Sequence, residues 1–364
     1  MRLGVSAAVV GDAIVPGDVE VSEGLITGVG LTPGSGSSIA VPGFIDVHVH
    51  GYQGVDFIDA DRDDHARIAR SVTSTGVTAY QPTLISQRVD DMAEAIRNHP
   101  GTVHGGARVL GFHLEGPFLS PDRAGAHTPT VLRTPSIDET RRLIHAGPVA
   151  QMTLAPELVG ALDLIDYLVD EGVTVSLGHS EASARTTHQA VSRGSRAFTH
   201  VFNAMRPMSH RNPGILDAAL SQGGAFLTAI FDGVHLSDEA ARVVIKCAGD
   251  RLAAITDATA AVGAGNTPVV LGRAEIEIID GAPRLPNGTI AGSILTMDQA
   301  FRNLLELGVE FTAVARATST GPAKLAGLAD SGAIQEGRSA DLVVLDDGYE
   351  VQQTLIGGAE VFHS

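Results

Sequence analysis

The chain has 364 residues, of which 44% are hydrophobic and 18% are charged, and its formal net charge is −17. This composition is typical of a compact folded protein, and the length allows a barrel of ordinary size with an accessory module. The negative charge argues against a nucleic-acid partner, because such binding needs clustered cations. No apolar run reaches the roughly 18 residues of a membrane span, and the single Cys247 cannot form an internal disulfide. We therefore expect a cytoplasmic protein without a membrane partner.

Both ends of the chain have the pattern of short strands. Near the N-terminus, Ala13–Val15 and Leu25–Val29 are separated by Pro-Gly and Glu-Gly turns, and strand-like segments return at Asp341–Leu345 and Thr354–Val361. We expect residues 1–43 and 330–364 to form one small β-sandwich module that is discontinuous in sequence.

Residues 44–329 alternate between apolar strand-like runs and helical segments, which is typical of repeated βα units. The eight runs are Phe44–His50, Val77–Thr83, Val109–Glu115, Met152–Glu157, Val173–His179, Ala197–His200, Phe226–Asp232 and Ala253–Asp257. Eight units predict an α/β fold of the (β/α)8 TIM-like barrel type, with its chemistry at the C-terminal ends of the strands. An open doubly wound sheet would gather its ligand at one switch point, whereas here polar residues end several strands.

The first run carries two histidines on one face. Side chains of a strand alternate between faces, so His48 and His50 point the same way and can grip one cation. The alternative is an ordinary polar pair on a half-exposed strand. The apolar neighbours Phe44, Ile45 and Val47 argue against it, because they indicate burial, where unpaired imidazoles are costly.

Further metal-capable side chains end later strands. Glu115 ends the third run, His179 the fifth and His200 the sixth, so with His48 and His50 they place five such side chains at one end of the predicted barrel. Each of these residues alone is weak evidence, but the combination predicts a catalytic centre with a divalent metal. Zinc is the first choice for such ligands, with Fe, Co, Mn or Cd as alternatives.

Two other residues have candidate roles beside this metal centre. His127, twelve residues after Glu115, could reach over the mouth of the barrel from a loop, although on its own it reads as a surface residue. Asp257 ends the eighth run, where it could simply cap the next segment. Beside an activated water, its carboxylate could instead take a proton and pass it to a leaving nitrogen.

These motifs together resemble a known family. The segments Pro42–Gly51 (PGFIDVHVHG) and Gly332–Leu345 (GAIQEGRSADLVVL) resemble the two ends of the amidohydrolase superfamily. More specifically, the chain is similar to N-acetylglucosamine-6-phosphate deacetylases in the family's order of motifs. Those motifs are His113–Phe118 (HLEGPF), Leu177–Ser180 (LGHS), Thr199–Met205 (THVFNAM), Asp232–Leu236 (DGVHL) and Thr256–Thr259 (TDAT).

The resemblance implies a metal-dependent amidohydrolase of amino-sugar metabolism. Its activity would be hydrolysis of N-acetyl-D-glucosamine 6-phosphate to D-glucosamine 6-phosphate and acetate. Glu115, His179 and His200 would bind the principal metal, and Asp257 would be the catalytic acid and base. His127 would contact the acetyl carbonyl oxygen. Because this sequence keeps His48 and His50, two metal ions per chain are expected, with Glu115 bridging them.

The resemblance also implies a substrate site and a partner. Asn203 and the backbone at Ala204 would hold the sugar phosphate, and the segment Ile290, Ala291 and Gly292 would line the sugar. Arg211 and His235 would contact phosphate in the site of a neighbouring subunit, which predicts a homodimer.

Two alternatives remain open from the sequence. Another amidohydrolase could act on a cyclic amide or an N-acyl substrate, but such enzymes commonly use a carboxylated barrel lysine, and neither Lys246 nor Lys324 ends a predicted strand. A catalytically dead scaffold relative usually loses ligands, whereas every expected ligand is present here.

Overall fold

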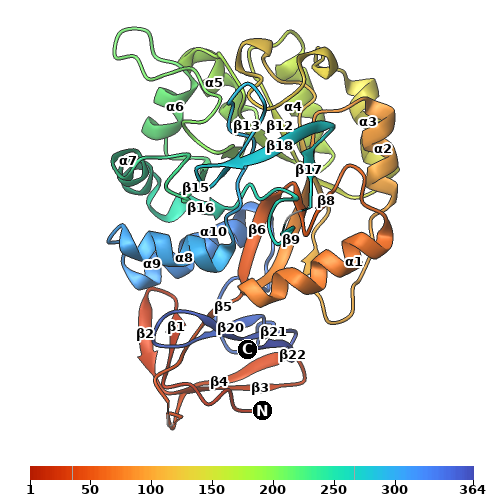
Figure 1. Cartoon of the computed structure of the whole chain (residues 1–364). Helices are drawn as coiled ribbons and strands as arrows, with labels where there is room; N and C mark the ends of the chain where they lie inside the picture. The colour runs from red at the N-terminus through yellow and green to blue at the C-terminus, as the bar shows by residue number, and fades with distance from the viewer. Residues whose placement is uncertain (35, 266) are drawn as a thin grey trace.

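The computed structural model describes residues 1–34, 36–265 and 267–364. Its larger part is a barrel surrounded by helices, and its smaller part is a β-sheet below the barrel that carries both ends of the chain (Figure 1). No helix in these described ranges is long and apolar enough to cross a membrane.

Eight parallel strands form the barrel wall in chain order. They are β6 (Phe44–Val49), β9 (Val77–Ile85), β11 (Phe112–Glu115), β12 (Val149–Leu154), β13 (Thr174–Leu177), β14 (Ala197–Phe198), β15 (Phe226–Ile230) and β16 (Leu252–Ile255). Each corresponds to one predicted run, with bounds that differ by a few residues. The third run is interrupted at Gly111, whose φ of 105° few other residues adopt, and its beginning forms the separate strand β10 (Arg108–Val109).

Each barrel strand is followed by a helix on the outside. The helices are α1 (Arg62–Ser71), α2 (Val89–Arg97), α3 (Ile137–Ala146), α4 (Ala161–Asp170), α5 (Ala184–Ser192), α6 (Ile215–Ser221), α7 (Asp238–Ala248) and α8 (Met297–Glu306). Their apolar faces pack on the strands, and the strand and helix side chains form one large buried core. The predicted (β/α)8 barrel is therefore confirmed.

Hydrogen bonds between the segments that follow β16 and the end of β6 close the barrel. The Asp257 N–H donates to the carbonyl oxygen of His48 (3.0 Å), and the His50 N–H donates to that of Ala258 (2.7 Å). The buried Asp46 carboxylate accepts from the Thr256 hydroxyl at 2.5 Å. Closure at this end of the strands brings the first and last catalytic motifs together, although they are about 200 residues apart in sequence.

The terminal segments build a second, separate sheet. Its strand order is β2 (Ala13–Pro16), β1 (Ala7–Val10), β5 (Ile39–Pro42), β20 (Leu342–Leu345), β21 (Val351–Ile356) and β22 (Ala359–His363). A two-stranded ribbon of β3 (Asp18–Ser22) and β4 (Leu25–Leu31) packs on it through Val19, Val21 and Ile26. The expected terminal β module is thus present. The predicted boundaries between this module and the barrel, at 43/44 and 329/330, stay predictions. The first lies at the junction between β5, which ends at Pro42, and β6, which begins at Phe44.

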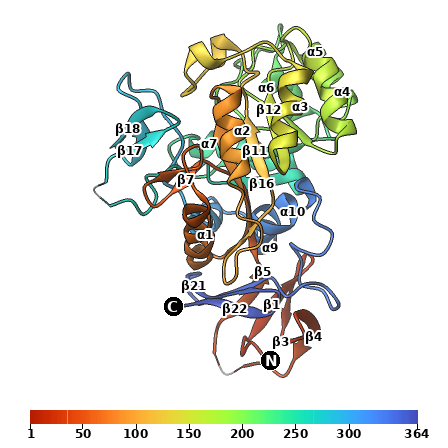
Figure 2. The ribbon, with the colours of Figure 1, turned by 90° about the vertical axis from the view of Figure 1, so that its right-hand side faces the viewer.

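A small three-stranded sheet is inserted between β16 and α8. It consists of β17 (Val269–Leu271), β18 (Ala274–Ile279) and β19 (Ala282–Arg284), and it projects from the side of the barrel (Figure 2). The remaining elements are the hairpin β7 (Gly51–Tyr52) and β8 (Val55–Asp56) and the short helices α9 (Phe311–Ala315) and α10 (Gly321–Leu325). Leu271 and the segment after β19 reach the mouth of the barrel, where the candidate site lies.

Candidate metal centre and active site

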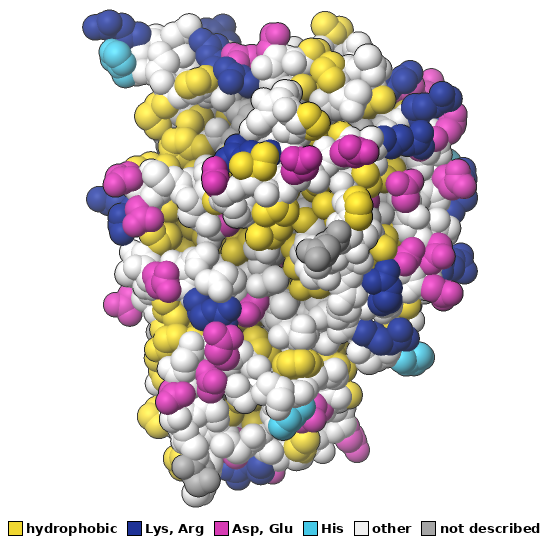
Figure 3. All heavy atoms as spheres, in the orientation of Figure 1, with side chains coloured by type: hydrophobic (Ala, Val, Ile, Leu, Met, Phe, Trp, Pro, Cys, Tyr) yellow, Lys and Arg dark blue, Asp and Glu magenta, His cyan; other side chains and the backbone are white. Residues whose placement is uncertain are grey.

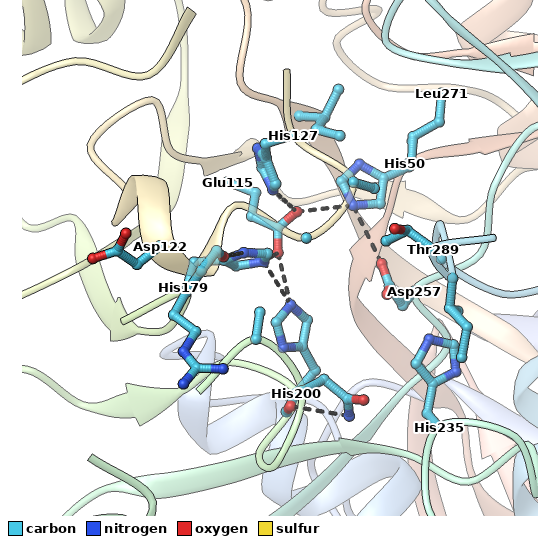
Figure 4. A pocket seen from close by; sticks show the side chains of 18 residues that line it. His50, Glu115, Asp122, His127, His179, His200, His235, Asp257, Leu271 and Thr289 are labelled. Carbon is cyan, nitrogen blue, oxygen red and sulfur yellow. Dashed lines mark hydrogen bonds and ion pairs between the residues drawn. The ribbon is translucent and has the colours of Figure 1, made fainter. Parts of the chain in front are cut away.

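The metal-capable side chains predicted from the strand ends all meet at one end of the barrel. His48 lies on β6 and His50 directly follows it, Glu115 ends β11, His179 and His200 follow β13 and β14, and Asp257 follows β16. All six are buried, with exposed fractions between 1% and 7%. Figure 4 shows five of them, His50, Glu115, His179, His200 and Asp257, converging from different strands.

Three of these side chains form a first group around one carboxylate oxygen. The Nε2 atoms of His179 and His200 are 3.1 Å apart and lie 3.2 Å and 2.9 Å from Glu115 Oε1. His179 Nδ1 donates to the carbonyl oxygen of Arg123 at 2.8 Å. This second hydrogen bond fixes the tautomer of His179 with its Nε2 lone pair toward Glu115, as is usual for a metal-bound imidazole.

A second group shares the same glutamate. The Nε2 atoms of His48 and His50 are 3.1 Å apart, and both lie close to Asp257 Oδ1, at 3.3 Å and 3.2 Å. His50 Nε2 is also 3.2 Å from Glu115 Oε2, the oxygen that faces away from the first group. Glu115 therefore contacts both groups: Oε2 faces His50, whereas His48 Nε2 is 3.6 Å from Oε1, the oxygen that faces the first group. Asp257 joins the side chains predicted for the second group.

The spacing of these atoms fits a cation in each group. Ligand atoms about 2.0–2.1 Å from a tetrahedral ion lie about 3.3–3.4 Å from each other. The contacts given above are close to that value, and two of them join the Nε2 atoms of neighbouring imidazoles, His48 with His50 and His179 with His200, as expected for ligands of a shared cation. The donor set of four imidazoles and two carboxylates is typical of zinc and related divalent ions.

The charges of the site also favour a cation. Burial alone would lower the pKa of His50, but hydrogen bonds to Asp257 and Glu115 outweigh it and raise the pKa to about 10. Burial would raise the pKa of Glu115, and the surrounding His48, His127 and His179 instead hold it well below its usual range. The two carboxylates are therefore ionised at neutral pH and attract positive charge to this point, as a proton or as a metal ion.

The backbone is held in an unusual conformation at three of these residues. His179, His200 and Asp257 have φ of 46°, 31° and 53°, in the left-handed region that residues with a Cβ rarely adopt. Such conformations persist where the surrounding structure enforces them, and they are concentrated at functional sites. Here they turn the side chains from the strand ends into the barrel mouth.

His127 lies against this metal centre, as expected for a residue that contacts the reacting group. Its ring is packed edge-on against His179, with 4.6 Å between centroids, and its Nε2 is 3.2 Å from Glu115 Oε2. Burial and the neighbouring His179 lower the pKa of His127 to about 4, so the ring is neutral at pH 7. A neutral imidazole can still donate one hydrogen bond to a carbonyl oxygen.

A cavity of about 350 Å³ opens over these residues. Its lining includes the polar side chains of Asn203 and His235, the backbone at Ala204, and the apolar Ile290 and Leu271. Gly292 also lines the cavity, whereas Ala291, between Ile290 and Gly292, is fully buried. The cavity therefore combines the metal-capable side chains with further hydrogen-bonding groups, which suits a small polar ligand.

His235 differs from the expectation that it serves a neighbouring subunit, because it lines the cavity of its own chain. Its Nδ1 is 2.7 Å from Asp232 Oδ2. Burial alone would lower the pKa of His235, but the hydrogen bond and charge of Asp232 outweigh burial and raise it. Sequence motifs cannot distinguish the two placements, because both put His235 after β15.

Arg211 does not line the cavity of its own chain within the described residues. It is exposed on the loop between β14 and α6, which projects at the upper left of Figure 1. In Figure 3 the projection at the same place carries basic and histidine side chains, while charges of both signs are interspersed over the rest of this face. The base of the loop holds His200 and Asn203 in the site, and its tip is directed away from it.

Several residues at the site were not identified from sequence. Ser86, which follows β9, contacts His127, and Asp232 contacts His235. Arg123 lines the cavity and forms an ion pair with Glu181. Ser86 and Arg123 make these contacts with residues 41 and 58 positions away, which no local pattern reveals. Asp232 is the one with a signal, since it opens the same DGVHL motif that contains His235.

Comparison with known proteins agrees with this geometry. The amidohydrolase family profile matches residues 39–361. Human N-acetylglucosamine-6-phosphate deacetylase is 40% identical over 90% of this chain and 85% of its own length. An N-acetylgalactosamine-6-phosphate deacetylase from Escherichia coli is 34% identical over 93% of each chain.

Solved structures give the same relationship. The crystal structure of N-acetylglucosamine-6-phosphate deacetylase from Thermotoga maritima has a TM-score of 0.93 at 33% identity and covers all of both chains. A mutant of the Mycobacterium smegmatis enzyme, in complex with N-acetyl-D-glucosamine-6-phosphate, has a TM-score of 0.93 at 34% identity over 99% of each chain.

Proposed function

The chain belongs to the amidohydrolase family, and we propose that it hydrolyses the acetamide of N-acetyl-D-glucosamine 6-phosphate to D-glucosamine 6-phosphate and acetate. The observation that carries this proposal is the buried cluster of imidazoles around Glu115 and Asp257. Two groups of three in it, His48–His50–Asp257 and Glu115–His127–His179, have ligand atoms within 4.8 Å of one another, and His200 Nε2 lies 2.9 Å from Glu115. The likeness over nearly the whole chain to proteins named for this reaction supports the same substrate.

The residues around Glu115 would hold two divalent ions. His179, His200 and Glu115 would bind one, and His48, His50 and Glu115 the other, with Asp257 close to the second. Such ions lower the pKa of water toward neutrality and polarise a carbonyl group. Zinc is the first choice from the ligand types.

The protein's own residues supply the proton transfers and the binding of the reacting group. The ionised Asp257 carboxylate accepts a proton from the attacking water and delivers it to the departing amine nitrogen. His127 donates from Nε2 to the acetyl carbonyl oxygen and stabilises the negative charge that develops there.

The polar residues of the cavity would hold the sugar phosphate. Asn203, the backbone at Ala204 and His235 all line it, and the raised pKa of His235 favours its binding to an anion. Ile290 and Gly292 would contact the sugar ring. These groups would offset, at the site itself, the repulsion between the negatively charged chain and a phosphorylated substrate.

We further propose that the enzyme is a homodimer in which Arg211 reaches the neighbour's phosphate. The support is its exposed position on the projecting loop, outside the cavity of its own chain. His235 would act within its own subunit. The cytoplasmic location stays a prediction from sequence.

The test is acetate release by purified protein from N-acetylglucosamine 6-phosphate. N-acetylgalactosamine 6-phosphate is assayed in parallel, because one relative is named for that substrate. A cyclic amide such as dihydroorotate serves as the probe for a different amidohydrolase. Acetate release that is lost on metal removal and restored by zinc is expected. Hydrolysis of the cyclic amide alone would refute the proposal, and inactivity on every substrate by protein with both ions bound would indicate a dead relative.

A further inference from the structure

Ser86 connects His127 to the end of the strand that carries Glu115. It directly follows β9, its exposed fraction is 1%, and no sequence motif marks it. Its Oγ lies 2.8 Å from His127 Nδ1 and 3.0 Å from the Glu115 carbonyl oxygen, and its single proton can be donated to either atom. Its backbone N–H donates to the same Nδ1 at 3.3 Å.

Gly116, which follows Glu115, leaves room for the Ser86 hydroxyl beside His127. A Cβ at Gly116 would lie 2.1 Å from Ser86 Oγ, and the φ of Gly116 is 90°. A side chain at this position would therefore displace the hydroxyl from between His127 and Glu115. The Ser86 contact and the backbone after the metal ligand fit each other closely.

Two contacts on opposite sides of the His127 ring determine where its proton lies. The Ser86 backbone N–H can only donate, so a proton on Nδ1 would leave a buried donor facing another donor. On the other side Nε2 faces Glu115 Oε2 at 3.2 Å, and an ionised carboxylate can only accept. Both contacts favour the tautomer with Nδ1 unprotonated and the proton on Nε2, and in that tautomer the Ser86 hydroxyl donates to Nδ1 rather than to the Glu115 carbonyl oxygen.

We propose that Ser86 is a positioning residue that holds His127 in the Nε2–H tautomer, with this N–H directed into the cavity. The inference rests on the proposed function, in which His127 donates to the acetyl carbonyl oxygen. When substrate enters, the Nε2–H exchanges Glu115 Oε2 for the carbonyl oxygen, while Ser86 keeps the ring in place from the Nδ1 side. With the proton on Nδ1, the ring would present a lone pair to the carbonyl and could not stabilise the oxyanion.

A double-mutant cycle tests this role in the metal-loaded enzyme. The variants are Ser86→Ala, His127→Ala and the two combined. The control is Ser319→Ala, because the Ser319 hydroxyl is equally buried and donates to the carbonyl oxygen of Pro42 at 2.9 Å, far from the site. For each variant, kcat and KM for N-acetylglucosamine 6-phosphate, metal content and thermal stability are measured.

Ser86→Ala should lower kcat about tenfold and change KM little, because a misplaced donor is missed mainly in the transition state. His127→Ala should lower kcat by roughly 10²- to 10³-fold, as for the loss of an oxyanion donor. In the His127→Ala background, Ser86→Ala should have no further effect on kcat. Multiplying losses, or a loss of metal in Ser86→Ala, would mean that Ser86 acts through Glu115 and would overturn the proposal. If kcat of Ser319→Ala fell as much as kcat of Ser86→Ala, the loss in Ser86→Ala would be a general effect of removing a buried hydroxyl on stability, and the proposal would be overturned.

A spectroscopic measurement separates this inference from the proposed function. In the zinc-loaded protein with ¹⁵N-labelled histidine, the His127 signals are those missing from His127→Ala. An unprotonated Nδ1 and a protonated Nε2 are expected in the wild type, with a mixture of tautomers in Ser86→Ala. A protonated Nδ1 in the wild type would refute the role of Ser86 even if acetate is released. Lack of acetate release with the expected tautomer would refute the function alone.

Discussion

Asp257→Asn is the sharpest test of the catalytic centre. Asp257 Oδ1 lies 3.2 Å and 3.3 Å from the Nε2 atoms of His50 and His48. Burial would raise the pKa of Asp257, but these two histidines hold it below its usual range, so the carboxylate is ionised and can accept a proton. Asparagine has nearly the same shape and cannot accept a proton. A general acid and base contributes typically about 10²- to 10⁴-fold to the rate.

The upper part of that range is expected, because the other carboxylates that line the cavity cannot take over. Glu115 is enclosed by imidazoles, and Asp122 points away from the centre (Figure 4). A loss of about 10³- to 10⁴-fold in kcat corresponds to about 4–5.5 kcal/mol of transition-state stabilisation.

The assay is acetate release under saturating substrate, with metal content measured on the same samples. Asp122→Asn is the matched control, since it removes the same charge from the same cavity and should keep nearly full activity. Asp257→Asn should retain the ion bound by Glu115, His179 and His200. Substantial turnover by Asp257→Asn with its metal bound would exclude Asp257 as the acid and base.

Three further predictions follow from the site. On addition of zinc, metal-stripped wild type should regain activity and bind about two zinc ions per chain. Glu115→Gln should bind neither ion tightly, because it loses the negative charge that both groups share. A Glu115→Gln protein with two tightly bound ions would contradict the bridging role. KM should rise with pH as His235 loses its proton, at a pH above the ordinary pKa of histidine, because Asp232 raises the pKa of His235. Asp232→Asn should move this rise in KM to lower pH. An unshifted pH profile would show that phosphate binding does not depend on protonation of His235. Arg211→Ala should raise KM roughly 10- to 100-fold through loss of a charge-assisted contact. If Arg211 serves the neighbour, mixed dimers of Arg211→Ala and Asp257→Asn subunits should recover activity, whereas no recovery would place Arg211 at its own site.

The sequence determined the barrel because the βα repeat is a local pattern. Each strand is a short apolar run, and several runs end on a residue whose type already suggests chemistry, as at Glu115 and His179. Because parallel strands of a barrel place their C-terminal ends on one rim, the metal centre could be predicted without knowledge of any contact. Alternation alone predicted that His48 on β6 and His50 directly after it point to one face.

Only the tertiary structure could decide which atoms meet at that rim. That Glu115 contacts both histidine groups depends on how β6 and β16 close the barrel, through the hydrogen bonds of Asp257 and His50. Ser86 meets His127 across 41 residues of chain, and no sequence period connects a strand end to the tip of a later loop. His235 shows the same limit, because its motif fixed the strand it follows but not whose cavity it enters. The sequence thus determined the residue types and their order, and the structure decided their partners, because partners are set by long-range closure and loop packing rather than by local periodicity.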